Sequence, residues 1–425
     1  MITKPALSRE AGFAEAQDQA DPLAPFREEF EWPADAEGRR LTYLVGNSLG
    51  LLPKGARALV NEELDEWARR GVEGHMKART PWYTYHEFLR DSTARLVGAL
   101  PEEVVVMNTL TTNLHLMLAS FYRPSGKRVK VLMEENAFPS DQYAIPSHLG
   151  VRGIDPSNVI VARARPGEVT LRTEDVERVF AEQGSEIALL LLGGVNYYSG
   201  QLFELGRLAA AARRAGIVVG YDLAHAVGNV PLALHDWDVD FAVWCSYKYL
   251  NGGPGAPGGC FVHKRHADNT SIARMGGWWG NDPSTRFQMR PEFTPRTSAD
   301  GWQLSNPPIL SMAPLRASME LFERAGFAAL RAKSEALTGY LEALLAAIPG
   351  SPVRVLTPSN VAERGCQLSL HIAGRGRAVH DALRARGIVT DYREPDVVRM
   401  APTPLYNSYR DVWHTANAMR EVLAG

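Results

Sequence analysis

The sequence has few cysteines, and they are not arranged as a redox or metal framework would require. Cys245, Cys260 and Cys366 form an odd set without disulfide or metal-site spacing. We therefore expect buried, reduced thiols and no metal. The N-terminal stretch contains no apolar signal segment, so the prediction is a cytoplasmic protein.

The sequence also lacks an excess of charge of either sign, and it lacks long apolar runs. The net charge is −2, from 46 basic and 48 acidic residues that are interspersed. Such a balance offers no electrostatic footprint for nucleic acid or for an anionic membrane. No apolar stretch approaches the roughly 20 residues that span a bilayer. We expect neither a nucleic-acid partner nor a membrane partner.

What the chain does contain is an alternation of strand-like and helical patterns. Its 425 residues, 45% of them hydrophobic, can bury a large core divided over two or three domains. Short apolar runs occur at residues 104–107, 129–133, 159–162, 187–192, 217–221, 241–245 and 260–262. Helical patterns lie between several of them, for example at 205–215. This order predicts an α/β fold with a mostly parallel central sheet covered on both faces.

The order of helical and strand-like patterns changes after about residue 310. Two long helical patterns, 313–324 and 327–348, precede short strands near 353–356, 367–372 and 397–400. We predict an N-terminal arm with part of the small domain at 1–45, a large domain at 46–310 and a smaller α+β domain at 311–425. The first part of the polar stretch 1–37 is expected to be a loosely attached arm.

An aspartate and a lysine stand at the ends of two consecutive buried strands. Asp222 follows the run 217–221, and Lys248 follows the run 241–245, 26 residues after the aspartate. This is the minimal apparatus for pyridoxal phosphate: the lysine forms a Schiff base, and the aspartate keeps the ring nitrogen protonated. Taken singly, each residue is more often a strand-end lysine or a helix-capping aspartate. The spacing and the glycine-rich run behind Lys248 favour the cofactor.

That glycine-rich run, residues 252–259, also matches the letters of a dinucleotide fingerprint. Gly253, Gly255 and Gly258 have the required spacing, but the run contains two prolines and precedes a strand. The fingerprint needs a strand–turn–helix context, so we reject it. The glycines are expected to let the backbone wrap closely around the lysine and its cofactor.

Two further strand ends carry residues that suit a phosphorylated aromatic cofactor. Residues 108–113 (NTLTTN) follow the strand 104–107 and precede the helical run 114–121. Backbone amides and hydroxyls at a helix N-terminus favour an anion, although an ordinary N-cap has the same composition. Phe138 follows the run 129–133, and its ring can stack on a pyridine; a lone Phe there is usually core.

Several longer segments carry a resemblance to a known family. They are GNSLG (46–50), LT-x-N (110–113), FPSD (138–141), DLAHAVGN (222–229), HDW (235–237), WCSYKYLN (244–251), SNPPIL (305–310) and PLYNS (404–408). From about residue 43 to the C-terminus the chain resembles the kynureninases, fold-type-I pyridoxal-phosphate enzymes of the aspartate aminotransferase superfamily. The aspartate–lysine pair is shared across that superfamily, whereas the combination of segments is specific to the family.

The resemblance implies a role for each matching residue. Lys248, Tyr247 and Asp222 are the implied catalytic residues, with Tyr247 as a candidate proton donor. The implied cofactor-binding residues are Leu110, Thr111, Phe138, Pro139, Ser140, Asp141, Asp222, His225, Tyr247, Lys248, Trp278 and Asn306. The implied substrate-binding residues are Ser48, His75, Asn306 and Arg399. At Gly193 the chain departs from members that carry a side-chain hydroxyl near the phosphate.

The implied reaction is hydrolysis of the Cβ–Cγ bond of L-kynurenine or 3-hydroxy-L-kynurenine, which yields L-alanine and anthranilate or 3-hydroxyanthranilate. The resemblance also implies a homodimer with shared active sites, to which Trp278 and Asn306 contribute across the interface. Tryptophan catabolism through the kynurenine pathway, NAD biosynthesis, or a pathway that uses anthranilate units would each employ such an enzyme.

Three other functions remain open on the sequence. A cysteine desulfurase or selenocysteine lyase needs a nucleophilic cysteine downstream of the lysine, and Cys366 lies 118 residues beyond Lys248. Its segment alternates like a strand, which favours a structural thiol. A non-catalytic module that retains pyridoxal phosphate is not supported by any charge asymmetry. An aminotransferase would use the same Asp222 and Lys248 without needing His75 and Asn306.

Overall fold

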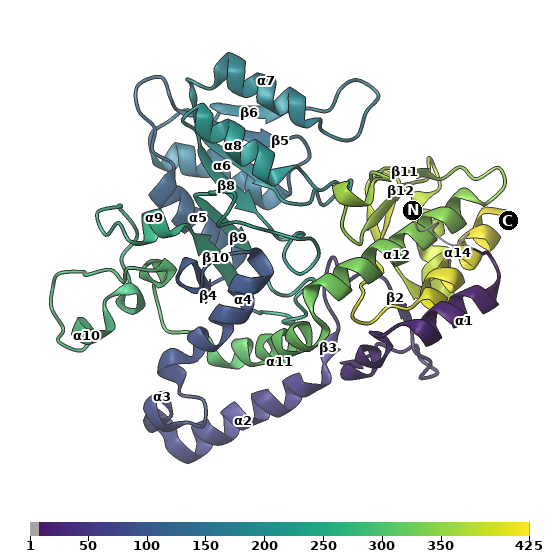
Figure 1. Ribbon diagram of the computed structural model, residues 1–425, viewed down its shortest axis with the longest axis horizontal. Helices are drawn as coiled ribbons and strands as arrows, with labels where there is room; N and C mark the ends of the chain where they lie inside the picture. Colours follow the sequence, from purple (N-terminus) through teal and green to yellow (C-terminus); the bar gives the residue numbers. More distant parts are fainter. Residues whose placement is uncertain (1–7, 425) are drawn as a thin grey trace.

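A seven-stranded sheet forms the centre of the larger of two domains (Figure 1). The computed structural model describes residues 8–424. The strands lie in the order β4 (Val104–Met107), β10 (Gly258–Val262), β9 (Phe241–Trp244), β8 (Val218–Asp222), β7 (Ile187–Gly193), β5 (Lys130–Glu134) and β6 (Val159–Ala162). Only β10 runs antiparallel to its neighbours within this sheet. The predicted mostly parallel α/β fold is therefore confirmed.

Both faces of this sheet are buried, which explains why its strands are continuous apolar runs. Alternate residues of β7 belong to different cores: Leu190 and Leu192 pack on one face, Leu189 and Leu191 on the other. One core includes residues of α4 (Arg90–Val97), α7 (Thr173–Gln183), α8 (Leu205–Arg214) and α11 (Ile309–Ala325). The other includes residues of α5 (Leu110–Phe121) and α6 (Pro139–Val151).

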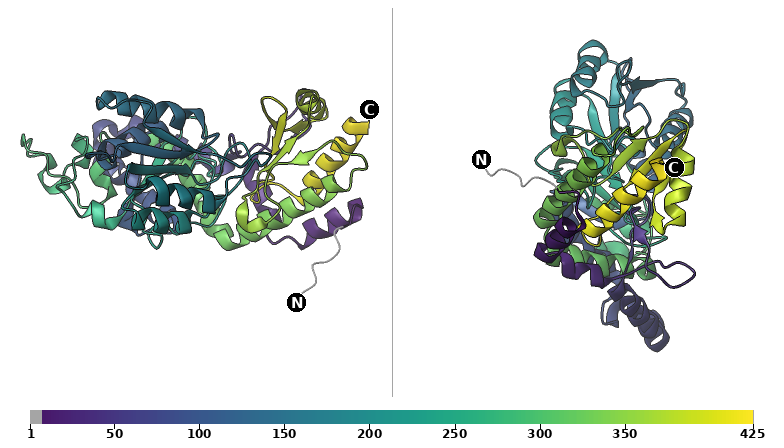
Figure 2. Two further views of the ribbon diagram at one scale, coloured as in Figure 1. Left: turned by 90° about the horizontal axis from the view of Figure 1, so that it is seen from above. Right: turned by 90° about the vertical axis from the view of Figure 1, so that its right-hand side faces the viewer.

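The smaller domain lies beside the large one and contains the C-terminal part of the chain (Figure 2). Its sheet has the order β11 (Arg354–Val355), β12 (Leu368–His371), β15 (Val397–Met400) and β14 (Asp391–Arg393). A short parallel pair, β2 (Thr42–Tyr43) with β13 (Ile388–Val389), lies nearby. Its helices are α1 (Ala11–Ala20), α12 (Phe327–Ala346), α13 (Gly376–Ala385) and α14 (Tyr409–Ala424). All four contribute residues to one shared core.

Two contacts bear on how the chain is divided between the domains. Met312, Leu315 and Met319 of α11 pack into the core of the large domain. From residue 8 on, the N-terminal stretch packs on the small domain, because α1 contacts α14 and Ala14 is fully buried. Residues 1–7 of the expected arm lie outside the described residues.

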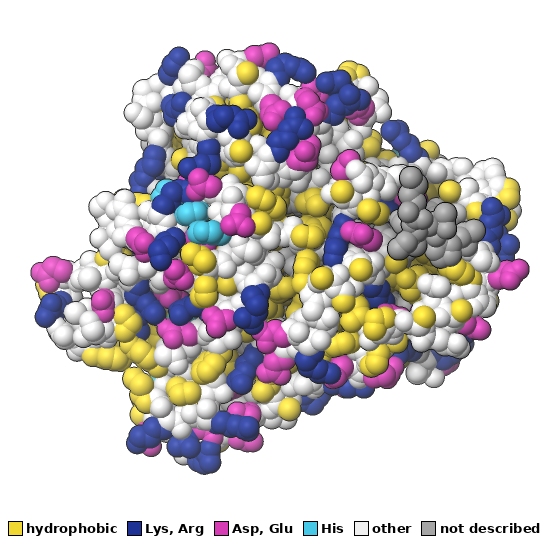
Figure 3. Space-filling view, in the orientation of Figure 1, with side chains coloured by type: hydrophobic (Ala, Val, Ile, Leu, Met, Phe, Trp, Pro, Cys, Tyr) yellow, Lys and Arg dark blue, Asp and Glu magenta, His cyan; other side chains and the backbone are white. Residues whose placement is uncertain are grey.

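The large domain also projects away from the small one through α2 (Lys54–Arg70), α3 (Gly74–Lys77) and the segment around α10 (Pro283–Arg286) (Figures 1 and 2). These projections expose large apolar side chains, namely Trp67, Val72, Met76, Met275, Trp278, Phe287, Met289 and Phe293. Yellow apolar atoms gather at the same lower left part of Figure 3. Exposed apolar clusters of this kind mark interaction surfaces.

The remaining short elements complete the course of the chain. They are β1 (Phe30–Glu31), which pairs with β3 (Leu52–Pro53), and α9 (Lys264–Ala267), which follows β10. Among residues 8–424, no helix combines the length and the hydropathy that crossing a bilayer requires.

The GNSLG segment is held against the loop that carries the predicted lysine. The Gly50 N–H donates to the carbonyl of Tyr247 at 2.8 Å. A Cβ on Gly50 would lie 2.5 Å from the carbonyl oxygen of Lys248 and 2.2 Å from Oδ1 of Asn251. Only glycine therefore permits this approach without moving the lysine loop.

We predict opposite effects of alanine at two glycines. Gly50→Ala should lower the free energy of unfolding by about 1–3 kcal/mol, as overpacking does. Gly339→Ala, inside α12 with open space around its Cα, should raise it by about 0.5–1 kcal/mol through helix propensity. Denaturant unfolding followed by circular dichroism measures both. A Gly50→Ala variant as stable as the wild type would contradict the packing argument.

Candidate active site

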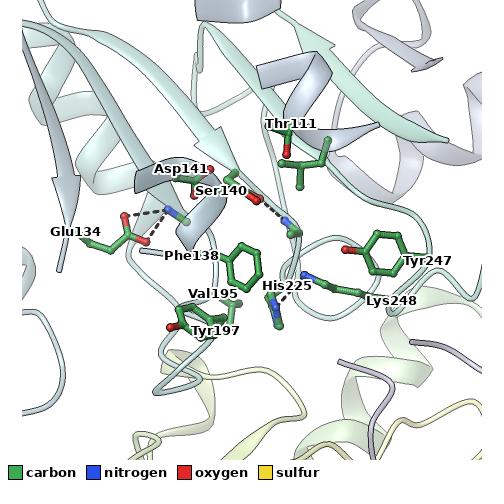
Figure 4. A pocket seen from close by; sticks show the side chains of 14 residues that line it. Thr111, Glu134, Phe138, Ser140, Asp141, Val195, Tyr197, His225, Tyr247 and Lys248 are labelled. Carbon is green, nitrogen blue, oxygen red and sulfur yellow. Dashed lines mark hydrogen bonds between the residues drawn. The ribbon is translucent and has the colours of Figure 1, made fainter. Parts of the chain in front are cut away.

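Most of the predicted cofactor-binding residues meet in one cavity at the carboxyl edge of the central sheet (Figure 4). Ligands bind at this edge in parallel sheets, because strand ends and helix N-termini converge there. The cavity is lined by Leu110, Thr111, Glu134, Phe138, Ser140, Asp141, Gly193, Val195, Tyr197, Asp222, Ala224, His225, Tyr247 and Lys248. Strands β5, β7 and β8, the loop after β9 and the first turns of α5 and α6 supply them.

Lys248 is the only lysine or arginine among these lining residues. Its side chain is held in the cavity, with the residue 8% exposed, and Nζ lies 3.1 Å from Nε2 of His225. Nζ is also 5.6 Å from the ring centroid of Phe138 and 5.7 Å from that of Tyr247. Burial, and then the charge of Lys248, lowers the pKa of His225 well below its usual value. A neutral imidazole can accept a hydrogen bond from the lysine.

Three buried carboxyl groups line the same cavity. Asp222 ends β8, Asp141 lies in the first turn of α6, and Glu134 ends β5. Burial raises the pKa of Asp141 well above its usual value, and the charges of Asp222 and Glu134 add to this. Burial also raises the pKa of Asp222, but the N–H of Ala224, 2.8 Å from Oδ1, and the charge of Lys248 oppose the rise. Asp222 is thus better placed than Asp141 to stay ionised and pair with a cation.

The N-terminus of α5 forms an anion-binding end of the cavity. Leu110 and Thr111 begin this twelve-residue helix after the N-cap Thr109. First-turn N–H groups have no partner within a helix, and the helix dipole favours an anion there. A Cβ on Gly258 would lie 3.2 Å from the Leu110 nitrogen, so the glycine lets β10 begin close to this helix end.

The arrangement fits pyridoxal phosphate. The phosphate suits the α5 N-terminus, the ring nitrogen suits Asp222, the aldehyde suits Lys248, and the ring suits the face of Phe138. Asp141 Oδ1 and His225 Nδ1 are buried without a hydrogen-bond partner among residues 8–424. Buried polar atoms require partners, and a polar ring in the cavity would supply them.

Ser48 and Arg399 lie together next to this cavity but do not line it. Arg399 of β15 is 1% exposed, and its Nη1 donates to the carbonyl of Tyr197 at 2.6 Å. It forms an ion pair with Asp391, whose Oδ2 also accepts from Ser48 Oγ at 2.6 Å. Arg399 Nε has no partner among residues 8–424. Tyr197 lines both the cavity and the adjacent interdomain groove, so it separates this cluster from Lys248.

Three further residues implied by the resemblance, His75, Trp278 and Asn306, do not line the cavity either. His75 lies on α3, where its Nδ1 is 3.0 Å from the carbonyl of Val72. Trp278 is 45% exposed and contacts Phe287, and Asn306 is exposed. Pro139, at the start of α6, also falls outside the lining set, one residue from Phe138.

Sequence reasoning did not identify Glu134, Val195, Tyr197 and Ala224 as lining residues. Glu134 had a usable signal, because it ends a predicted strand as Asp222 does. Tyr197 had none, since its position depends on how the loop after β7 meets the small domain. Gly193 had been expected near the phosphate; it lies against Glu134, whose Oε1 would be 2.9 Å from a Cβ there.

The three cysteines are buried and free, as the sequence predicts. Cys366 precedes β12 in the small domain and does not line the cavity. Burial raises the pKa of its thiol to about 12. Because the thiolate is the nucleophile, this residue is a poor candidate for sulfur chemistry.

Solved structures with the same fold define the class of protein. One is a C-DES mutant with glycine covalently linked to its PLP cofactor, with TM-score 0.77 and 18% identity over 90% of this chain and 96% of that chain. Another is the cysteine desulfurase CsdA from Escherichia coli, with TM-score 0.76 and 18% identity over 95% and 98%. At these identities the likeness establishes the fold. The chain has the fold of pyridoxal-phosphate enzymes of this type.

Sequence relatives establish the family. A kynureninase of Xanthomonas campestris pv. campestris (strain B100) is 54% identical over 416 residues, which are 97% of each chain. A kynureninase of Myxococcus xanthus is 53% identical over 414 residues, again 97% of each. Residues 330–419 match the model of the kynureninase C-terminal domain. The chain belongs to the kynureninase family.

Borohydride trapping tests the assignment of the lysine. Reduction of the protein with bound pyridoxal phosphate should fix the cofactor on the peptide that contains Lys248, as peptide mass mapping would show. Lys248→Ala should lose the fixed cofactor, whereas Lys264→Ala, at an exposed lysine paired with Glu102, should keep it. Labelling of another lysine in the wild type would refute the assignment.

Proposed function

We propose that this protein is a pyridoxal-phosphate-dependent hydrolase that cleaves the Cβ–Cγ bond of L-kynurenine and 3-hydroxy-L-kynurenine. The products are L-alanine and anthranilate or 3-hydroxyanthranilate. Membership of the kynureninase family over nearly the full chain supports this reaction. The observation that carries it is the cavity in which Lys248 faces the Phe138 ring, with Asp222 at a buried strand end.

The chain's residues hold the cofactor at three points. Backbone N–H groups at Leu110 and Thr111 would bind the phosphate, Phe138 would cover one face of the ring, and Asp222 would keep a proton on the ring nitrogen. When bound, pyridoxal phosphate supplies an electron sink for negative charge that develops at the substrate's Cα. Lys248 lies where it can take the proton from that carbon, with His225 orienting its amine.

Arg399 is the proposed partner of the substrate's α-carboxylate. Its unpaired Nε is buried, and its Nη1 and Nη2 are fixed by the carbonyl of Tyr197 and by Asp391. A guanidinium held in this way binds a carboxylate with defined orientation. Ser48, which donates to Asp391, supports the same cluster.

Tyr247 is the proposed proton donor to the substrate's Cβ after hydrolysis of the γ-carbonyl. Burial raises the pKa of Tyr247 above its usual value, so the phenol keeps its proton at neutral pH. A general acid must be protonated at the working pH and within hydrogen-bond reach of the atom it protonates. Tyr247 lines the cavity beside Lys248, and this position supports the proposed role.

We propose a homodimer in which each site receives residues from both subunits. His75 on α3 and Trp278 near α10 lie on the projections that expose large apolar side chains, and Asn306 is exposed just before α11; none of the three lines the cavity of its own chain. Association through these surfaces would bury the apolar patch. It would also bring polar side chains to the partner's site, in a cytoplasmic enzyme of tryptophan catabolism.

Product analysis tests the reaction. Kynurenine should yield anthranilate and alanine in equal amounts, because hydrolysis releases one of each. Cysteine as substrate should release no sulfide, since Cys366 is buried away from the cavity. Sulfide release without anthranilate would replace the proposed function with that of a cysteine desulfurase.

Subunit mixing tests the shared sites. Lys248→Ala and Asn306→Ala dimers should each be almost inactive. After the subunits are exchanged, about a quarter of sites should be intact, because half of the dimers are hybrids with one complete site each. Recovery of activity well below this level, or a fully active monomer in sedimentation, would contradict the proposal.

We predict a preference for 3-hydroxykynurenine. A ring hydroxyl needs hydrogen-bond partners once desolvated, and a site that supplies them discriminates strongly. His75 and Asn306 can supply them to the partner's site, so kcat/KM should be higher for the hydroxylated substrate. His75→Trp combined with Asn306→Thr should shift the preference toward kynurenine. Equal wild-type kcat/KM values for kynurenine and 3-hydroxykynurenine would show that these residues do not recognise the ring hydroxyl.

A further inference from the structure

Glu134 is a buried acid in the cofactor cavity to which the proposed mechanism gives no task. It is the last residue of β5 and is 4% exposed. Its Oε1 and Oε2 lie 3.1 and 3.3 Å from the N–H of Gly193 (Figure 4). A buried carboxylate is retained at a stability cost unless it is paired, so this position calls for an explanation.

The contacts of Glu134 lead directly to Asp222. Gly193 ends β7 and lies opposite Asp222 of β8 in the parallel register. The next N–H, that of Gly194, donates to the carbonyl of Asp222 at 2.8 Å. By holding the Gly193 N–H, Glu134 fixes the β7 end against which Asp222 is positioned.

The space around Gly193 is fitted to this acid. A Cβ on Gly193 would lie 2.9 Å from Oε1 of Glu134, so any larger residue would displace the carboxylate. The pair is therefore interdependent: glycine at 193 admits the carboxylate, and the carboxylate satisfies the glycine's N–H.

Resting on the proposed cofactor, we propose that Glu134 is a positioning residue for the ring nitrogen, acting through Asp222. Fixed behind the β7–β8 strand ends, its negative charge makes the Asp222 carboxylate a stronger acceptor for the protonated nitrogen. The hydrogen bonds that its carboxylate accepts from the backbone keep Asp222 in register. Glu134 itself does not touch the reacting atoms of the substrate.

The charge of Glu134 changes in the physiological range. Burial raises its pKa to about 7, the N–H of Gly193 opposes the rise, and the charge of Asp222 adds to it. Other ionisable groups that line the cavity are Asp141 on α6, Tyr197 after β7, His225 after β8, and Tyr247 and Lys248 after β9. Glu134 ionises as pH rises through about 7, so its support of the cationic ring should strengthen in that direction.

Three variants separate an electrostatic role from a structural one. Glu134→Gln keeps an oxygen that can accept from Gly193 but carries no charge, whereas Glu134→Ala loses both. Glu135→Gln is the matched control, because its neighbouring carboxylate pairs with Arg163 and does not line the cavity.

The primary measurement is the dissociation constant of pyridoxal phosphate for each full-length protein at pH 6 and pH 8. At pH 8, Glu134→Gln should bind about tenfold more weakly than the wild type, the change that one pKa unit of lost basicity produces. At pH 6 the two should converge. Nitrogen-15 resonance of a ring-labelled cofactor in the holoenzyme should show reduced protonation in Glu134→Gln at pH 8.

The proposal would be overturned if Glu134→Gln binds pyridoxal phosphate as tightly as the wild type at both pH values and only Glu134→Ala binds it more weakly. That result would leave Glu134 a structural role. The same applies if Glu135→Gln has an equal effect. These measurements use no kynurenine, so a negative result would refute the role of Glu134 without bearing on the proposed function. Wild-type protein that binds the cofactor but does not cleave kynurenine would refute that function alone.

Discussion

The site depends on one electrostatic constraint: the cavity buries three carboxyl groups against a single lysine. Glu134, Asp141 and Asp222 come from different elements, yet all lie within the lining of one cavity with Lys248. Unpaired buried charge is destabilising, so such groups take up protons or acquire partners. A ring cation facing Asp222 would supply the missing positive charge, and the α5 N-terminus would hold the phosphate. The cavity is thus adapted to a zwitterionic aromatic ligand.

The fold makes that arrangement possible because parallel strands end at a common edge. The ends of β5 and β8 deliver Glu134 and Asp222, and the loop after β9 delivers Lys248. The proposed partner of the substrate's carboxylate comes from elsewhere, since Arg399 belongs to the small domain. Asn47 donates a hydrogen bond to the side-chain oxygen of Gln367 at 2.9 Å. Gln367 and Arg399 both donate to the carbonyl of Tyr197. Through this carbonyl the small domain aligns its arginine with the cavity of the large domain.

Much of this could be predicted from the sequence, because apolar runs buried on both faces identify strands, and the residue after each run marks the sheet edge. Asp222 and Lys248 were found by this rule, and Glu134, which follows the run 129–133 as Asp222 follows 217–221, could have been found by it too. The packing of α11 on the large domain was not predictable, since α11 and α12 have similar helical patterns. Tyr197 and Asp391 were missed for a related reason, because their positions depend on contacts between domains. The roles proposed for His75 and Asn306 depend on a second subunit, which one sequence does not describe.

The effect of pyridoxal phosphate on thermal unfolding tests the central claim most directly. A ligand that binds only the native state raises its Tm by mass action. The account predicts that saturating cofactor raises the Tm of the wild type markedly, and that of Asp222→Asn much less, because the neutral amide no longer compensates the ring cation. An equal rise in both proteins would show that the cavity does not recognise the ring through its buried charge, and would contradict the account.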